Sequence, residues 1–204
     1  MMRTLERPLS ALDAIFVRRS VRRYTDEKLD EFTVRSLLDA AVQAPTAMHT
    51  EPWAFVVIQD EDTLKRYSDQ AKGSWAKEAI TYRDLHLPGD VATGSRFVER
   101  FTSPNFCVFY DATTLIVICG KPMGPFVVAD CWLAAGNLML AACAMGLGTC
   151  CIGSAVPALS APEAKAELGI PGDVTPIAPI IVGVPRGTAE AVPRKDPETL
   201  YWKR

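Results

Sequence analysis

The sequence predicts a single α+β domain. Its 204 residues are enough for one substantial core, and nothing in the composition divides the chain in two. Three runs rich in β-branched residues, 53–58, 113–119 and 175–184, have the character of buried strands. Segments with helical patterning lie between these runs. Because there is no internal repeat, low-complexity tract or Gly/Ser linker, we expect residues 1–204 to form one domain.

The first elements surround a cluster of arginines. Ser10 or Asp13 can cap a short helix that runs to about Val17 and delivers the cluster at residues 18–23. Asp30 is the expected N-cap of a second helix. The apolar residues of that helix recur at i, i+3, i+4 and i+7, which predicts one buried face: Val34, Leu37, Leu38 and Ala41.

A loop and a charged helix flank the first strand. Pro45 stops the second helix, and the residues after it form a loop before the strand at 53–58. Residues 60–71 are expected to form a charged surface helix with acids in its first turn. From 74 to 106 the pattern is irregular and contains turn sequences, so this stretch is expected to be an insertion.

The longest apolar helix is predicted at 126–145, after the strand at 113–119. Twenty residues span roughly 30 Å, so a membrane helix has to be considered. Asp130 and Asn137 would be unfavourable in lipid, the run is isolated, and Lys and Arg do not flank both ends. We therefore expect a helix buried at the centre of the molecule or in a subunit interface.

The C-terminal third continues with short elements. Gly146 suits the position after the helix end, and 149–152 reads as a short strand. A capped helix is expected to open at Ser160–Glu163 and to close at Gly169. The last strand, 175–184, contains two prolines that restrict its pairing. A polar tail follows and ends in the apolar residues 200–202.

Bulk properties exclude several classes of protein. A net charge of −2 argues against a nucleic-acid protein. Six cysteines without a C-x-x-C pair indicate reduced core residues, and two histidines without ligand spacing give no metal site. The first ten residues contain no apolar signal region, so we expect a cytoplasmic protein.

The arginine cluster is the strongest local signal for a ligand. Four guanidinium groups and the hydroxyl of Ser20 lie within residues 18–24, and guanidinium forks bind phosphate oxygens bidentately. The alternative is a solvated basic helix end that needs no ligand. A dinucleotide fingerprint and a P-loop are both absent, since Gly146-x-Gly148 lacks the remaining glycine and precedes a strand.

Four motifs in order resemble the FMN-dependent nitroreductase-like family. They are Arg-x-Ser-x-Arg at 18–22, the loop Pro45–Trp53, the glycine-bearing stretch Gly146–Ser154 and Pro193-Arg194-Lys195. The resemblance covers about residues 12–202 and is weakest between 76 and 107. It implies a three-layer α/β/α sheet sandwiched by helices in an intertwined homodimer. The apolar helix would form the dimer core, the 74–106 insertion would cover the flavin, and a C-terminal arm at 186–204 would embrace the partner.

The resemblance also implies a cofactor site for FMN. Arg18, Ser20, Arg22 and Arg194 are similar to the family's phosphate and ribityl ligands, with Arg19 and Lys195 as less certain contributors. The turn after the short strand would lie along the flavin ring, with the Gly153 amide facing N5. The loop that follows the second helix would reach the flavin from the other subunit. The implied contacts in these two loops are Cys151, Ile152, Gly153 and Ser154, and Pro45, Thr46, Ala47 and His49.

The loop departs from the family pattern at two positions. His49 stands where the family often has Asn, and Glu51 stands where it often has Gln. A histidine can donate a similar hydrogen bond but titrates near neutral pH, whereas an ionised carboxylate cannot donate. We interpret His49 as a cofactor contact and not as an acid.

The implied activity is ping-pong hydride transfer. NAD(P)H would reduce the flavin and leave, and a nitroaromatic, quinone or similar electrophile would then be reduced. No side-chain nucleophile is needed, and Cys150 and Cys151 are interpreted as packing residues because adjacent cysteines close a strained ring. Dehalogenation, flavin fragmentation and azoline oxidation on the same scaffold remain alternatives. A non-catalytic flavin-binding protein and a cofactor-free anion-binding dimer also remain possible.

Overall fold

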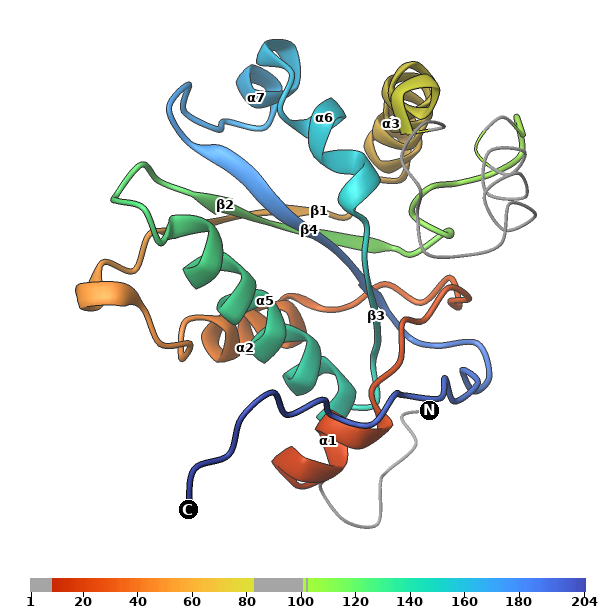
Figure 1. The fold of residues 1–204 in the computed structure, drawn as a ribbon. Helices are drawn as coiled ribbons and strands as arrows, with labels where there is room; N and C mark the ends of the chain where they lie inside the picture. Colours follow the sequence, from red (N-terminus) through yellow and green to blue (C-terminus); the bar gives the residue numbers. More distant parts are fainter. Residues whose placement is uncertain (1–8, 83–100, 102) are drawn as a thin grey trace.

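A four-stranded sheet forms the centre of the molecule. The computed structural model describes residues 9–82, 101 and 103–204 (Figure 1). The strands are β1 Trp53–Ile58, β2 Thr114–Gly120, β3 Gly148–Cys151 and β4 Thr175–Gly183. Their order is β1-β2-β4-β3, and every adjacent pair is antiparallel. The predicted α+β class is confirmed.

Helices cover both faces of the sheet. Side chains of β2 alternate between two cores, with Leu115 and Val117 in one and Ile116 and Ile118 in the other. The helices α3, α6 and α7 lie over the first core, and α2 and α5 lie over the second (Figure 1). Their bounds are α2 Glu31–Ala41, α3 Glu61–Tyr82, α5 Val127–Ala144, α6 Val156–Leu159 and α7 Pro162–Glu167. The three-layer arrangement is thus present in one chain.

Two helix ends follow the capping signals of the sequence. Ser10 and Asp13 together form a capping box at the start of α1 (Ala11–Val17), and the Asp30 carboxylate accepts the Thr33 N–H at 2.7 Å to begin α2. The expected cap of α7 is wrong, because Ala161 occupies that position without a side-chain bond. Short helical turns at 47–49, 153–155 and 156–159 were not predicted, since so few residues carry no periodicity.

Helix α3 is longer and more buried than the sequence predicts. It continues to Tyr82, so residues 74–82 are helical and not irregular. Its buried face, with Leu64, Tyr67 and Ala71, joins the first core, and the Ser68 hydroxyl accepts the Val108 N–H at 2.8 Å. Residues 83–100 and 102 lie outside the described part, so the expected flavin cover stays a prediction.

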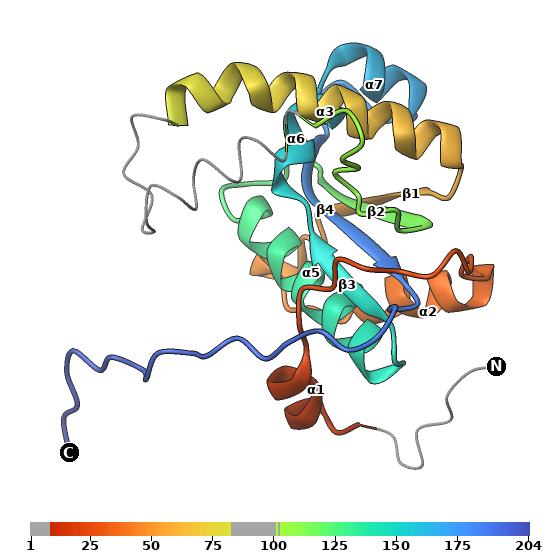
Figure 2. The ribbon, with the colours of Figure 1, turned by 90° about the vertical axis from the view of Figure 1, so that its right-hand side faces the viewer.

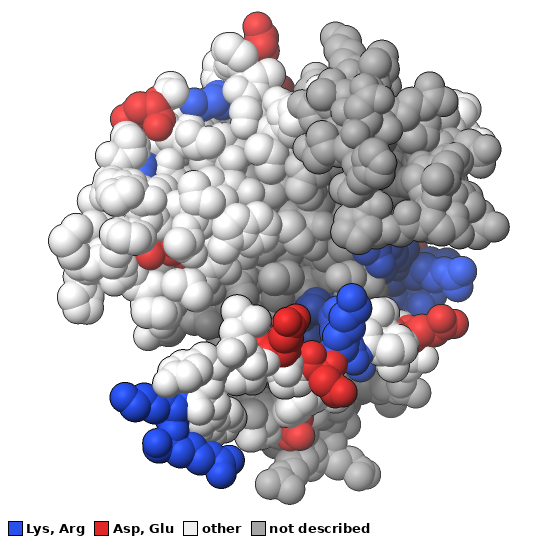
Figure 3. Space-filling view, in the orientation of Figure 1, with Lys and Arg blue, Asp and Glu red and all other residues white. Residues whose placement is uncertain are grey.

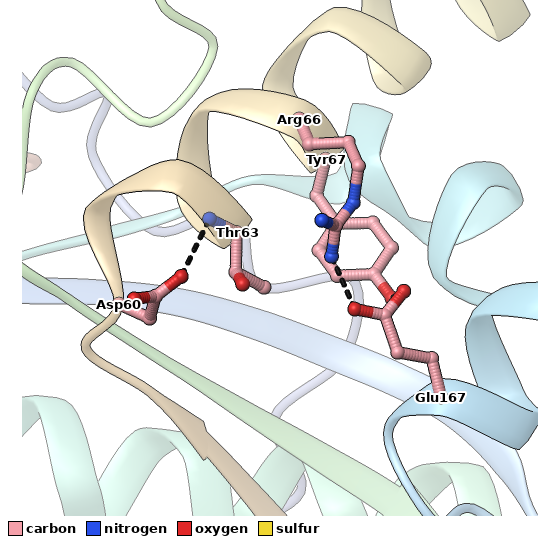
Figure 4. Close-up of polar contacts among 5 residues, drawn as sticks. All are labelled: Asp60, Thr63, Arg66, Tyr67 and Glu167. Carbon is pink, nitrogen blue, oxygen red and sulfur yellow. Dashed lines mark hydrogen bonds and ion pairs between the residues drawn. The ribbon is translucent and has the colours of Figure 1, made fainter.

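Polar contacts attach α3 to α7. The Tyr67 hydroxyl donates to Glu167 Oε2 at 2.9 Å, and Arg66 pairs with the other oxygen of the same carboxylate (Figure 4). At the start of α3, Asp60 Oδ2 accepts the Thr63 N–H at 2.9 Å (Figure 4). Burial and the Glu167 carboxylate raise the pKa of Tyr67. The tyrosine therefore stays neutral and can donate this bond at physiological pH.

Strand β4 is an inner strand although it contains two prolines. The register against β2 shifts between Ile118 and Cys119, which leaves Ile177 as an extra residue beside Pro176. Such a bulge is a position where proline is tolerated. The Pro179 carbonyl accepts the Ile152 N–H at 2.8 Å, just past β3.

Among the described residues, helix α5 alone is long and apolar enough to cross a membrane. The core helix of a soluble protein can meet the same two criteria. It packs on α2 and the sheet, and Gly146 ends it with φ 77°. The Gly146 N–H donates to Cys143 and the Leu147 N–H to Ala142, which is a Schellman ending. Only a third of the helix is buried within the chain. Val128, Trp132 and Leu133 are exposed.

Candidate functional site

The arginine segment begins where α1 ends. Arg18 is the C-cap, and its N–H donates to the Ala14 carbonyl at 3.0 Å. Arg19 Nη1 donates to the carbonyls of Phe16 at 2.7 Å and Arg18 at 2.8 Å. These bonds satisfy carbonyls at the helix end that have no partner within the helix. The basic-helix-end interpretation therefore holds for Arg19, whose guanidinium is committed to the backbone.

The rest of the segment extends the sheet beyond β3. Ser20 forms a parallel bridge with Thr149, and the Val21 N–H donates to the Thr149 carbonyl at 2.9 Å. The contact is tight, because a Cβ on Gly148 would lie 2.8 Å from the Val21 side chain. Two stretches far apart in the sequence, 18–22 and 148–151, are thereby held side by side, as Figures 1 and 2 show.

Arg18 and Arg22 both act on the same residue of β3. Burial raises the pKa of the Cys150 thiol, and the positive charges of Arg22 and Arg18 oppose that rise. Arg22 also lies over the Tyr110 ring, with its Cζ 5.8 Å from the ring centroid. Among the described residues, no carboxylate forms an ion pair with either arginine. The two guanidinium groups are thus able to bind an anionic ligand.

The cysteines beside the arginines are not poised for redox chemistry. All six cysteines of the chain are free, including Cys150 and Cys151. Burial raises the pKa of Cys151 to about 11, so its thiolate is scarce near neutral pH. This agrees with the interpretation of both residues as packing groups.

The predicted flavin-facing turn directly follows β3. Cys151 ends the strand, Ile152 bonds to β4, and Gly153–Ala155 form the short helix η2. Gly153 is exposed, and a Cβ built on it would meet nothing within 4 Å. Ser154 is half-buried. The turn therefore follows the strand with which the arginine segment pairs, and it leaves open space beside its glycine.

The loop of Pro45, Thr46, Ala47 and His49 contacts the N-terminal turn of α5. The Ala47 N–H donates to Asp130 Oδ1 at 3.3 Å. Asp130 is 4% exposed, and its Oδ2 has no hydrogen-bond partner among the described residues. The loop is also strained, since Met48, His49 and Glu51 have φ of 53°, 53° and 43°.

This loop and the arginine segment do not meet within one chain. Burial raises the pKa of the Cys143 thiol, and the positive charges of Arg18 and Arg19 oppose that rise. The two arginines therefore lie near Cys143, at the C-terminal end of α5. Asp130, which holds the loop, precedes Cys143 by 13 residues on α5. At 1.5 Å per residue these two sites on the helix are roughly 20 Å apart. The site residues therefore form two separate groups.

Arg194 lies in the exposed tail that follows β4 (Figure 2). It forms no hydrogen bond or ion pair with the residues that the structure describes. The expected convergence of Arg194 with Arg18 and Arg22 stays a prediction.

Sequence reasoning missed a hollow next to Arg22. It has a volume of about 400 Å³ and is lined by Arg22, Arg23, Tyr24, Tyr110, Asp111 and Arg186. The sequence places Arg23 in the arginine cluster, but Tyr110 and Arg186 carry no motif. Only the pairing of residue 24 with residue 185 brings the three arginines together.

Comparison with known proteins decides the family. The family model described as "Nitroreductase family" matches residues 15–184. The chain belongs to the nitroreductase family. This nitroreductase-family chain is 29% identical over 199 residues to an Archaeoglobus fulgidus protein, provisionally named NADH dehydrogenase/NAD(P)H nitroreductase. The match covers 93% of this chain and 95% of the relative.

Solved structures of the family share the fold. A nitroreductase with bound FMN from Bacteroides fragilis superposes with a TM-score of 0.75 at 25% identity, over 95% of this chain and 99% of the other. A nitroreductase with bound FMN from Desulfitobacterium hafniense has a TM-score of 0.75 at 24% identity, over 94% of this chain and 97% of the other. An iodotyrosine deiodinase bound to FMN and 3-iodo-L-tyrosine has a TM-score of 0.74 at 22% identity, over 95% of this chain and 100% of the other. At these identities the two likenesses show the fold alone.

Proposed function

We propose that this protein is an FMN-dependent oxidoreductase that uses NAD(P)H and reduces a nitroaromatic, quinone or related electrophile. The observation that carries the proposal is the junction of the arginine segment with β3. Arg18 and Arg22 lie there without carboxylate partners among the described residues, beside the open turn at Gly153. FMN is bound in solved relatives, and NAD(P)H appears in a relative's name.

The residues present fit the chemical groups of FMN. Arg18, Ser20 and Arg22 would hold the phosphate and the ribityl chain, because guanidinium groups bind phosphate through charge-assisted hydrogen bonds. The Gly153 turn would face the ring, where the lack of a side chain permits close approach of the backbone. Arg19 would support this group from the helix end, as its hydrogen bonds indicate.

Bound FMN would supply two-electron redox chemistry between NAD(P)H and a second substrate, for which ping-pong kinetics are expected. The chain's own residues would bind the cofactor and orient it. The positive charges of Arg18 and Arg22 would neutralise the charge of the cofactor's phosphate. No catalytic side chain is required, and the raised pKa values of Cys150 and Cys151 leave both thiols protonated near neutral pH.

The proposal includes a homodimer, because one chain supplies only half of the site. The loop at 45–51 lies roughly 20 Å along α5 from the arginines, so it would serve the site of a second copy. The surface suits such a dimer. Leu12 and Phe16 on α1 and Trp132 and Leu133 on α5 are 66%, 73%, 42% and 48% exposed. Figure 3 shows few charged side chains over α5.

The exposed tail fits the same dimer. Leu200, Tyr201 and Trp202 are 91%, 78% and 74% exposed, which is unfavourable for apolar side chains in an isolated chain. A tail that embraces the partner would bury these residues. It would also let Arg194 reach the phosphate site of the second copy.

Anaerobic reduction tests the activity. Purified protein with FMN is mixed with NADH or NADPH, and the visible flavin absorbance is followed by stopped flow. We expect rapid bleaching, and reoxidation when nitrofurazone, menadione or a ferric salt is added. A protein that holds FMN but is not bleached by either nucleotide would be a flavin-binding protein without reductase activity.

A further inference from the structure

The hollow beside Arg22 lies where the arginine segment leaves β3. Ser20 is bridged to Thr149, but four residues later Tyr24 forms an antiparallel bridge with Pro185, beyond the end of β4. The Arg186 N–H donates to the Arg23 carbonyl at 2.9 Å, which continues this pairing. The hollow is therefore built by the segment, the chain after β4 and the turn before β2.

Two arginines face each other across this pairing. The bridge between residues 24 and 185 places Arg23 opposite Arg186. Like charges directly opposite on paired strands are destabilising. Neither arginine forms an ion pair with a described carboxylate, and Asp111, which lines the same hollow, does not come within 4.0 Å of them. The fold thus keeps a repulsive pair that a bound anion would stabilise.

The opposite wall is a strained turn. Tyr110 and Asp111 are consecutive residues with φ of 52° and 57°, a conformation that side chains disfavour. Hydrogen bonds from Tyr110 N–H to Cys107 at 3.0 Å and from Ala112 N–H to Phe109 at 3.0 Å fix the turn. Strain of this kind is concentrated at ligand sites. Here it places an aromatic ring below the Arg22 guanidinium.

We propose that this hollow binds the 2′-phosphate of NADPH and that Arg23 and Arg186 determine a preference for NADPH over NADH. The inference rests on the proposed function. Two guanidinium forks match the oxygens of a phosphate dianion, and arginine is the residue that accommodates this phosphate in other NADP sites. The flavin phosphate and ribityl chain are assigned to Arg18, Ser20 and Arg22, and Arg22 also lines one side of the hollow. Arg23 and Arg186 lie at the next bridge along the segment and are not assigned to the flavin.

The double variant Arg23→Ala/Arg186→Ala tests the assignment in the FMN-loaded protein. We expect kcat/KM for NADPH to fall about tenfold or more, with kcat/KM for NADH and the Kd for FMN unchanged. The Lys double variant, which keeps both charges, should retain part of the preference. Arg35→Ala, which removes an exposed arginine from α2, is the matched control. Loss of the repulsive pair should leave Tm unchanged or higher.

Several outcomes would overturn the assignment. One is a wild-type preference for NADH. The others are a double variant in which kcat/KM falls equally with NADPH and NADH, and a double variant in which kcat/KM changes with neither. Weaker FMN binding in the double variant would assign the hollow to the flavin phosphate instead.

A measurement without catalysis separates this inference from the proposed function. If the wild-type protein oxidises neither nucleotide, calorimetry with adenosine 2′,5′-bisphosphate and with 5′-AMP still tests the hollow. The supporting result is a wild-type protein that binds the bisphosphate more tightly than 5′-AMP and a double variant that loses this difference. That result would support the anion site even if the reductase proposal fails. Equal affinity of the wild-type protein for the two probes would contradict the anion site as well.

Discussion

Neighbouring arginines in the segment at 18–22 have different environments. Arg19 donates both of its described side-chain hydrogen bonds to carbonyls at the end of α1. Arg22 instead reaches the Ser20 carbonyl only at 3.5 Å and lies over an aromatic ring. A guanidinium without a strong partner is the one that a phosphate can engage.

Arg22→Ala should therefore weaken FMN binding. Loss of a charge-assisted contact to the cofactor should cost about 1.5–3 kcal/mol, which is roughly 10- to 150-fold in Kd. Fluorescence titration of the apoprotein with FMN measures the change. Arg35→Ala on α2 is the control and should bind as the wild type does. Equal affinities of the Arg22 variant and the wild type would show that the segment has another purpose.

Asp130 is the residue that holds the loop at 45–51. Its Oδ1 accepts the Ala47 N–H, and the loop contains three residues with positive φ that need external support. We expect Asp130→Ala to speed hydrogen exchange at the Ala47 amide, while Asp130→Asn keeps an acceptor and part of the protection. Mass spectrometry of the peptide that spans residues 45–51 measures the exchange.

Asn137→Ala provides the matched control for Asp130. Asn137 also lies on α5 and donates to α2, at the Ala40 carbonyl, at 3.3 Å. Its removal should leave exchange in the loop unchanged. If both variants accelerated exchange equally, the loop would depend on the position of α5 and not on Asp130.

Residue chemistry could be predicted from the sequence where it depends on close neighbours. Asp30 and Ser10 lie directly before apolar periodic segments, and both cap as expected. The interpretation of Arg19 as a helix-end residue was an open alternative, because a basic cluster can serve a helix dipole or an anion. The position of Arg186 beside Arg23 could not be predicted, since it arises from a pairing between Tyr24 and Pro185, which are 161 residues apart. The contact of Tyr110 with Arg22 likewise joins segments that are distant in the sequence.

Among the elements, the junction of the arginine segment with β3 depends on one glycine. A Cβ at position 148 would lie 2.8 Å from three carbons of the Val21 side chain. The backbone of Val21 is hydrogen-bonded to Thr149, the residue next to Gly148. Neither position can therefore shift without breaking this pairing.

Gly148→Ala should push the segment away from β3. We expect a lower Tm and weaker FMN binding together, because the same bridge places Arg18 and Arg22. Circular dichroism and the FMN titration measure the two effects. Gly73→Ala on α3 is the control, since its Cβ would meet nothing within 4 Å and alanine favours a helix. A Gly148 variant with wild-type Tm and wild-type FMN affinity would contradict the assigned role of this junction.

Element boundaries were predictable where a pattern starts or stops sharply. β1 was predicted to the residue, and β2, β3 and β4 differ by one residue at their ends. Helix α3 was predicted to end 11 residues too early, because the sequence after Ala71 loses its regular pattern. Its burial comes from contacts with the stretch at 101–112, which no local pattern reveals.

At the scale of the whole molecule, the two groups of site residues lie at opposite ends of α5. Exposed apolar side chains lie on the two contacting helices α1 and α5, at Ile15, Phe16 and Leu133. A second copy packed on this surface would bring a loop of one chain to the arginines of the other. The order of the strands and this separation could not be obtained from the sequence, because both depend on pairings between distant segments.

Leu133→Glu should disrupt the dimer and FMN binding together. Leu133 is 48% exposed in one chain, and a carboxylate there would be buried without a partner in the proposed interface. Size-exclusion chromatography with light scattering measures the mass. Ala166→Glu, at an exposed position on α7 over the other face of the sheet, is the control. A Leu133 variant that remains dimeric and retains FMN would place the interface elsewhere.

The most direct test of the FMN site is the visible spectrum of the purified protein after incubation with FMN and removal of the free cofactor. We predict flavin absorbance that travels with a dimer on size-exclusion chromatography and is reduced in the Arg22→Ala variant. A wild-type protein that is colourless and remains so after this incubation would contradict the assignment of the arginine segment and the β3 turn to FMN.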